Sequence, residues 1–340
     1  MAKHELESVA RALVSKGKGI LAADESLGTI KGRFERIKVE STEENRRSYR
    51  DMLFTTRGIE EFISGIILFD ETIRSKAKDG RPFPEVLGQK GIMPGIKVDK
   101  GPVDLPGFPG EKVTEGLDGL RGRLNEYRGL GARFAKWRAV IAIGDGIPTR
   151  TCIDANAHAL ARYAALCQEA GLVPIVEPEV LMDGAHTIER CEEATEATLK
   201  SVFSELQEHR VVLEGMLLKP NMVLSGKECP KQATIPEVAE ITVRCLRRVV
   251  PAAVPGIVFL SGGQSAELAT DHLNAMNALG GHPWEISFSY ARALQDPALK
   301  AWKGEASNVP MAQQIFYHRA KCNGAARYGK YSKQMEAAAA

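Results

Sequence analysis

The sequence lacks any apolar run long enough to cross a membrane. Its best apolar stretch, 249–260, is interrupted by Pro251 and Pro255, whereas a membrane-spanning helix needs about 20 mainly apolar residues in a row. The first six residues, MAKHEL, include an acidic residue and no apolar core, which is not the pattern of a secretory signal. We therefore expect a cytoplasmic protein without a membrane partner.

Motifs for metals, nucleotides and nucleic acids are also missing. The six cysteines contain no CxxC pair and the seven histidines no HxH or HxxxH pair, so the sequence indicates no metal site. It contains neither GxGxxG after the first apolar run nor a phosphate-binding GxxxxGKS or GxxxxGKT motif. The 45 basic residues nearly balance the 43 acidic ones, which argues against a nucleic-acid partner. We expect no cofactor.

The sequence does contain eight short apolar runs, each followed by a polar or glycine-rich break and a helical segment. This alternation predicts βαβ units, and eight of them favour a closed (β/α)8 TIM barrel of the α/β class. We expect a single domain over 1–340, with an N-terminal amphipathic helix, a core over about 17–331 and a flexible tail over 332–340. The runs are 19–24, 65–70, 94–99, 132–138, 173–177, 217–221, 257–261 and 285–289.

The segments between these runs have the apolar spacing of amphipathic helices. The capping box of Ser41 and Glu44 is expected to start the helix at 42–55. The Pro- and Gly-dense segment 101–110 is interpreted as a long loop after the third strand. Further helices are expected at about 154–170, 186–208, 236–249 and 266–279.

One stretch, 217–221 with the sequence LLKPN, places a lysine at the tip of a buried strand. The residues before this lysine, 215–218, are apolar and too few for a helix. Pro220 removes a backbone donor, which ends strand pairing there. Lys219 then has an apolar wall behind it, and an amine without its proton can attack a carbonyl carbon. A lone lysine at a strand end is also commonly just solvated, so the other strand ends decide between the two interpretations.

Ionisable and hydroxyl side chains recur at the ends of the other runs. In a (β/α)8 barrel, the C-terminal strand ends carry the active site. Because side chains alternate along a strand, Lys136 shares a face with Arg138, and Glu177 shares one with Glu179. So many ionisable strand ends favour a functional site over a solvated surface. The full set is Asp24, Lys97, Lys136, Arg138, Glu177, Glu179, Lys219, Ser261 and Ser289.

These residues fit the chemistry of an amine that acts on a carbonyl group. Lys219 is the candidate nucleophile, with positive charge beside it from Lys136 and Arg138. Glu177, at the end of the fifth run, and Glu179, two residues farther on, provide proton transfer. Asp24, from the first strand, could take a proton from a hydroxyl farther along the substrate.

Two further features indicate anion binding on either side of this amine. The turn 261–263 offers backbone N–H groups, as phosphate loops of barrels do, and Arg292 would complete that pocket. Arg33 and Lys97 indicate a second anionic end. Two such pockets fit a bisphosphorylated carbonyl substrate, although a Gly-Gly turn also commonly does no more than join a strand to a helix.

With these residues in place, the sequence closely resembles class I fructose-1,6-bisphosphate aldolase from about residue 17 to 331. The motifs run in order along nearly the whole chain. They are GILAADES (19–26), TEENRRSYR (42–50), DGRPFP (79–84), GIKVDKG (95–101), GLDGL (116–120), FAKWR (134–138), VPIVEPE (173–179), LLKPNMV (217–223), FLSGGQS (259–265) and FSYARAL (288–294).

The resemblance implies roles by position. Lys219 would form a Schiff base with the substrate ketone, and Glu177 would be the general acid and base, assisted by Glu179 and Lys136. Asp24 would help to remove the proton of the C4 hydroxyl. One phosphate site would be formed by Ser261, Gly262, Gly263, Ser289 and Arg292. The other phosphate and the sugar hydroxyls would be met by Ser26, Thr29, Arg33, Lys97 and Arg138.

The resemblance also implies a reaction, a pathway and an assembly. The reaction is the reversible cleavage of fructose 1,6-bisphosphate to dihydroxyacetone phosphate and glyceraldehyde 3-phosphate, without a metal, in glycolysis and gluconeogenesis. A homotetramer is expected. The same chemistry on sedoheptulose 1,7-bisphosphate is an open alternative, and the preference for fructose 1-phosphate is also open.

Two alternatives fit the residues less well, and two positions depart from the family pattern. A barrel glycosidase would need carboxylates flanking a glycosidic bond, usually from different strands, whereas Glu177 and Glu179 share one. A non-catalytic scaffold would be expected to lose some of Lys219, Glu177 and Asp24, and all three are present. Ala291 stands where animal members have glycine, and because its N–H can still donate we expect little change from it. The terminal tyrosine of the animal and plant enzymes is missing, so we expect proton exchange on the enamine to be slower or to be served by another group.

Overall fold

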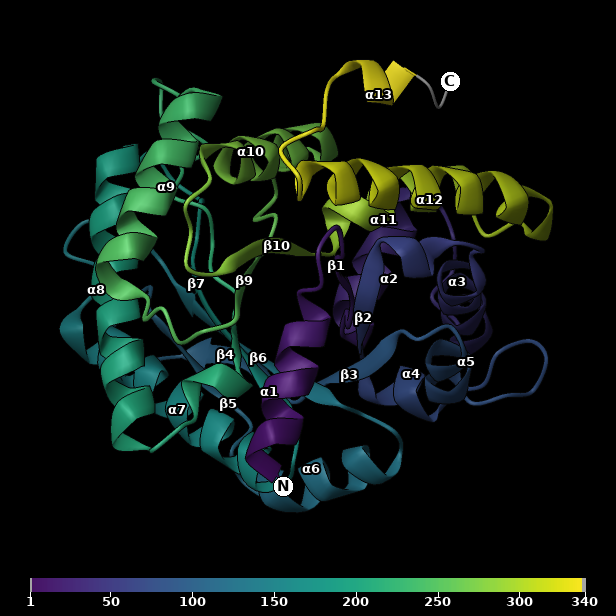
Figure 1. Ribbon diagram of the computed structural model, residues 1–340, viewed down its shortest axis with the longest axis horizontal. Helices are drawn as coiled ribbons and strands as arrows, with labels where there is room; N and C mark the ends of the chain where they lie inside the picture. Colours follow the sequence, from purple (N-terminus) through teal and green to yellow (C-terminus); the bar gives the residue numbers. More distant parts are fainter. Residues whose placement is uncertain (1, 338–340) are drawn as a thin grey trace.

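A computed structural model describes residues 2–337 and contains a closed barrel of eight parallel strands (Figure 1). Around the barrel the strands follow one another as β1, β10, β9, β8, β7, β6, β3 and β2. This is the sequential order of a (β/α)8 barrel, so the predicted fold class is confirmed. The strands are β1 (Gly19–Ala23), β2 (Ile63–Leu68), β3 (Met93–Lys97), β6 (Phe134–Ile141), β7 (Val173–Val180), β8 (Leu217–Leu218), β9 (Gly256–Phe259) and β10 (Glu285–Tyr290).

Helices form a layer around the outside of the barrel (Figure 1). Most of them connect one strand to the next, which parallel pairing requires. None of the helices in residues 2–337 combines the length and the hydropathy that a membrane span would need. The helices are α1 (Ala2–Leu13), α2 (Leu27–Arg36), α3 (Glu43–Thr55), α4 (Asp70–Arg74), α5 (Phe83–Gln89), α6 (Leu120–Gly129), α7 (Arg150–Glu169), α8 (Ile188–Glu208), α9 (Ile235–Val249), α10 (Ala266–Leu279), α11 (Arg292–Trp302), α12 (Val309–Ala326) and α13 (Gln334–Ala337).

The N-terminal helix α1 closes one end of the barrel. It lies across the middle of the ring of strands (Figure 1) and packs its apolar face into the barrel interior. Leu13 and Val14 are buried there together with Ile20 of β1 and Phe134 of β6. A second, larger apolar core fills the space between the strands and the outer helices. The helix therefore excludes water from the end of the barrel where the strands begin.

Inside the barrel, the inward-facing side chains change from apolar to charged along several strands, among them β7 and β8. Ile175 belongs to the apolar interior, and Glu177, two residues farther on, faces the same way. The same step leads from Leu217 to Lys219 on the neighbouring strand. The closed end is thus apolar and the opposite end polar, which places the ionisable groups at the C-terminal ends of the strands.

Two local predictions were wrong. Helix α3 is capped by Thr42, whose hydroxyl accepts the N–H of Asn45 at 3.1 Å, and not by Ser41. The segment predicted as a loop after the third strand contains β4 (Gly101–Asp104), which pairs antiparallel with β5 (Lys112–Glu115). The hairpin was missed because the proline and glycine content of 101–110 masks the short strand at its start.

Part of the tail predicted to be flexible is a short helix. Helix α13 is held to α12 through Glu336, which pairs with Arg319 and accepts the hydroxyl of Tyr331 at 2.7 Å. Residues 338–340, also part of that prediction, lie outside the described residues.

The packing at the closed end of the barrel leads to a testable prediction at Gly95. A Cβ atom on Gly95 would overlap the ring of Phe134, which β6 places directly beside it. We expect Gly95→Ala to lower the free energy of unfolding by about 1–3 kcal/mol, as overpacked cores do. Gly88→Ala is the matched control, since a Cβ there meets no atom within 4 Å. Urea unfolding measures both. If Gly95→Ala were as stable as Gly88→Ala, the described packing would be wrong.

Candidate active site

A cavity of about 580 Å³ opens at the C-terminal ends of the barrel strands. It lies at the polar end of the interior, opposite α1. All the predicted site residues except Gly263 line it, so the structure brings together groups that are up to 268 positions apart in the chain, from Asp24 to Arg292. The predicted residues in the lining are Asp24, Ser26, Thr29, Arg33, Lys97, Lys136, Arg138, Glu177, Glu179, Lys219, Ser261, Gly262, Ser289 and Arg292.

Four buried ionisable groups form a continuous chain across the cavity floor. Lys219 Nζ lies 3.2 Å from Glu177 Oε1, and the other carboxylate oxygen of Glu177 lies 3.2 Å from Lys136 Nζ. Lys136 Nζ also lies 2.7 Å from Asp24 Oδ2. All four residues are less than 9% exposed. Two amines and two carboxylates alternate along this chain, so each charge has an opposite one beside it.

Two members of this chain, Lys136 and the terminal Asp24, have shifted pKa values. Burial disfavours the charged form of Asp24, but Lys136 and Lys219 outweigh this effect and lower the pKa of Asp24 to about 2. Burial would likewise lower the pKa of Lys136, but the carboxylates of Asp24 and Glu177 outweigh it and raise this pKa above its usual value. Asp24 is therefore ionised and Lys136 protonated at neutral pH.

Lys219 is positioned by an abrupt end to strand β8. Its N–H donates to the Val176 carbonyl at 2.8 Å, and Pro220 has no N–H to continue the ladder, although its carbonyl accepts the N–H of Leu260 at 3.2 Å. The side chain of Asn221 then replaces the backbone hydrogen bonds of the strand. Its oxygen accepts the N–H of Val180 at 2.9 Å, and its amide donates to Thr195 at 3.1 Å. The backbone on both sides of Lys219 is thus fixed to β7 and α8, which aims the amine into the cavity.

The predicted cations Lys136, Arg138 and Lys97 of the site are each paired with a carboxylate. Lys136 is held between two carboxylates, and Arg138 Nε donates to Glu179 at 2.5 Å. Lys97 Nζ pairs with Asp99 at 2.6 Å. The sequence could not show the partners of Lys136 and Arg138, because they lie on other strands. Asp99, in contrast, lies only two residues after Lys97 in the same run. The cavity floor is a network of ion pairs rather than a patch of excess positive charge.

One end of the cavity has the features of an anion pocket. Gly262 and Gly263 follow Ser261 with φ of +60° and +93°, values that favour glycine and turn the backbone sharply after β9. Arg292, the first residue of helix α11, reaches this turn: its Nη2 lies 3.1 Å from the position of a Cβ on Gly263. Within residues 2–337 the buried Ser289 hydroxyl has no hydrogen-bond partner, which leaves it free for a ligand.

The second predicted anionic end is built differently from the expectation. Arg33 Nη1 lies 2.6 Å from the buried carboxylate of Glu25, which also pairs with Arg50. Burial opposes ionisation of Glu25, but Arg50 and Arg33 outweigh it and lower its pKa. Ser26 caps helix α2 by accepting the N–H of Thr29 at 3.4 Å. Arg33 is thus fixed by Glu25 at the start of the α2 segment.

Several lining residues were missed by the sequence interpretation. Glu25 and Asp99 hold the predicted cations in place, and Arg36 and Lys100 add further positive charge at the rim. Glu25 directly follows Asp24, so it reads as an ordinary residue after a strand. Its burial between two arginines depends on α2 and α3, which only the fold brings together. Arg36 could have been found from its spacing of three residues from Arg33 on one helix.

Comparisons with known proteins show which family this chain resembles. The family model described as fructose-bisphosphate aldolase class-I matches residues 5–340. A protein of Xanthomonas campestris named "Probable fructose-bisphosphate aldolase class 1" is 62% identical over 97% of this chain and 99% of its own length. The fructose-bisphosphate aldolase of Dictyostelium discoideum is 55% identical over 96% and 93%.

A solved structure gives the same result. The fructose-bisphosphate aldolase of Plasmodium falciparum, in complex with TRAP and a small-molecule inhibitor, superimposes with a TM-score of 0.96. It shares 54% sequence identity, and the match covers 97% of this chain and 96% of that one.

The lowered pKa of Asp24 predicts an acid-dependent loss of stability. The pKa falls from 3.8 unfolded to about 2 folded, so the ion pair stabilises the fold above about pH 4 and is lost as the pH falls towards 2. Between pH 5 and pH 3, the wild type should lose about 1 kcal/mol more unfolding free energy than Asp24→Asn. Urea unfolding at both pH values measures this. If both proteins lost the same unfolding free energy between pH 5 and pH 3, Asp24 would not be ionised as described.

Proposed function

The chain belongs to the class I fructose-bisphosphate aldolase family, and from this premise we propose that it cleaves fructose 1,6-bisphosphate through a Schiff base on Lys219. Members of this family are carbon–carbon lyases. The observation that carries the proposal is the buried amine of Lys219, which lies 3.2 Å from a carboxylate at the floor of a cavity lined by cations.

Schiff-base formation would use the Lys219–Glu177 pair. The amine passes a proton to Glu177 and attacks the C2 carbonyl carbon of the substrate. The resulting carbinolamine loses its hydroxyl as water when Glu177 returns a proton, which leaves an iminium ion on Lys219. Lys136 stays protonated next to Glu177, and Glu179 is tied to Arg138, so both assist by holding Glu177 and the substrate in place.

Cleavage would then use the ionised Asp24. The C4 hydroxyl gives its proton to Asp24, the C3–C4 bond breaks, and its electron pair moves into the iminium to form an enamine. Glyceraldehyde 3-phosphate leaves as the aldehyde. Protonation of the enamine at C3 and hydrolysis of the iminium then release dihydroxyacetone phosphate and restore Lys219.

The two ends of the cavity would bind the two phosphates. Strand β9 is the direct neighbour of β8, so the Ser261 turn that follows β9 lies beside Lys219, and Arg292 reaches this turn. We assign to them the C1 phosphate, which is one carbon away from the ketone. Ser26, Thr29 and Arg33 would meet the phosphate at the far end.

Family membership supports proposals about the substrate range, the pathway, the assembly and the location of the protein. Sedoheptulose 1,7-bisphosphate has the same ketone and both phosphates, so the same residues could process it as an alternative substrate. We propose a role in glycolysis and gluconeogenesis, a homotetrameric assembly and a cytoplasmic location. The full-length similarity to class I members supports these proposals.

Reductive trapping tests the role of Lys219. Borohydride added with dihydroxyacetone phosphate should inactivate the enzyme and leave a stable adduct on the peptide that contains Lys219, as found by mass mapping. Lys219→Arg should lose both the adduct and cleavage. Lys200→Met, which changes an exposed lysine on α8, is the matched control and should keep both. An adduct on another lysine, or loss of cleavage on adding EDTA, would contradict the proposal.

The assignment of the two phosphates has its own test with fructose 1-phosphate, which lacks the second phosphate. Arg292→Ala should raise KM roughly tenfold or more for both substrates, because a charge-assisted contact is lost. Arg33→Gln should raise KM for fructose 1,6-bisphosphate alone. Steady-state kinetics of both variants with both substrates decide the point. The assignment fails if Arg33→Gln weakens both substrates equally.

A further inference from the structure

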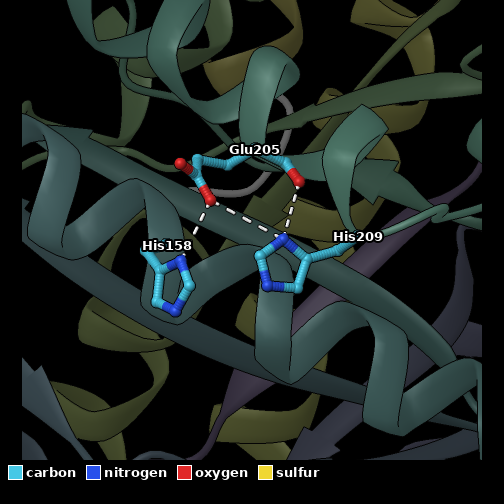
Figure 2. A group of neighbouring side chains, drawn as sticks. All are labelled: His158, Glu205 and His209. Atoms are coloured by element: carbon cyan, nitrogen blue, oxygen red, sulfur yellow. Dashed lines mark hydrogen bonds and ion pairs between the residues drawn. The ribbon is translucent and has the colours of Figure 1, made fainter.

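Away from the cavity, three ligand-type side chains from two helices converge on one point of the barrel's outer layer (Figure 2). His158 comes from α7, Glu205 from the last turn of α8, and His209 from the residue that caps α8. Figure 2 shows both imidazole rings next to Glu205. We propose that this group, the His158 cluster, is a binding site for a divalent transition-metal ion such as Zn²⁺. None of its residues lines the cavity of the aldolase site.

The spacing of the ligand atoms suits a small tetrahedral ion. His158 Nδ1 lies 3.0 Å from Glu205 Oε2, and His209 Nδ1 lies 3.6 Å from the same oxygen. An ion with bonds of about 2.0–2.1 Å in tetrahedral geometry holds neighbouring ligand atoms roughly 3.3 Å apart. The two observed distances lie on either side of this value. The ligand atoms of the two histidines lie within 4.8 Å of each other, so the two rings must also turn towards a common point to form a coordination shell.

The hydrogen bonds of the cluster can be given up without leaving a buried group unpaired. His209 Nδ1 now lies 2.9 Å from the carbonyl of Glu205. That carbonyl also accepts the backbone N–H of His209 at 3.0 Å, so it keeps a donor when the ring turns to an ion. A bound ion would replace the protons that the rings now share with Glu205.

The ligand set selects the class of ion. Two imidazoles with one carboxylate suit Zn²⁺, Co²⁺, Ni²⁺ or Cu²⁺, whereas Mg²⁺ and Ca²⁺ prefer shells of oxygen ligands. The side chain of His158 is 53% exposed and that of Glu205 30%. Water can therefore reach the ion and complete its shell as the fourth ligand.

The position of the cluster gives the ion a structural effect. Helix α7 follows β6, which carries Lys136, and α8 follows β7, which carries Glu177. An ion bound to both helices would tie together the two units behind these strands. Since it binds only the folded chain, it would raise the melting temperature, and this rise would grow with the logarithm of the free-ion concentration once that exceeds the Kd. Aldol cleavage itself would not depend on it.

Another group of this kind lies in the described part of the chain, and it serves as a control. His318, Cys322 and Glu336 also converge. There, however, Glu336 is already bound by Arg319 and Tyr331. A cation at that point would have to displace the arginine, so we expect the His158 cluster to be the tighter site.

Titration of the full-length protein with ZnCl₂ tests the proposal by calorimetry and by melting temperature. Wild type should bind about one ion per chain and melt several degrees higher with Zn²⁺ in excess. His158→Ala and His209→Ala should each weaken binding at least about tenfold, since a ligand is lost. His318→Ala should bind as the wild type does. Co²⁺ in place of Zn²⁺ should give the visible absorption of a four-coordinate ion, which His158→Ala removes.

Two outcomes would overturn the site. One is a wild type that neither binds Zn²⁺ at concentrations in excess of the protein nor melts higher with it. The other is binding that survives in the His158→Ala, His209→Ala double variant, because the ion would then occupy another place. Cleavage of fructose 1,6-bisphosphate by each variant confirms that it is folded, and this readout is independent of the metal.

Discussion

The structure depends on the placement of Lys136 between Asp24 and Glu177, deep inside the barrel. Ionised groups are costly to bury, and they are tolerated only where each has an opposite charge and hydrogen bonds. Lys136 provides this for two carboxylates from two other strands at once. Glu177 then extends the same compensation to Lys219. The reactive amine is thus kept in a site that excludes most water without an unpaired charge beside it.

This charged floor is possible because the other end of the barrel is apolar and closed. Helix α1 covers this closed end with side chains such as Leu13, and Phe134 fills the barrel interior next to it. Water therefore reaches the ionised groups only through the cavity where substrate enters. A dry interior strengthens each ion pair and makes proton transfer between neighbouring groups depend on geometry rather than on solvent.

Much of this architecture could be predicted from the sequence, because strand ends and their side chains are local features. The eight strands, the barrel and the inward position of Lys219 follow from short apolar runs and the alternation of side chains. What the sequence could not provide is the pairing between strands. The carboxylates around Lys136 depend on closure of the barrel, and the position of Glu25 between Arg33 and Arg50 depends on the packing of α2 and α3. The His158 cluster was hidden for the same reason, since its ligands come from two helices.

The most direct test of a covalent intermediate on Lys219 follows the ketone oxygen. Iminium formation expels this oxygen as water, so hydrolysis must install an oxygen from solvent. In a single turnover in H₂¹⁸O, with dihydroxyacetone phosphate reduced at once by NADH and glycerol-phosphate dehydrogenase, mass spectrometry should find ¹⁸O at C2 of the trapped product. Retention of ¹⁶O at C2 would contradict the Schiff-base mechanism.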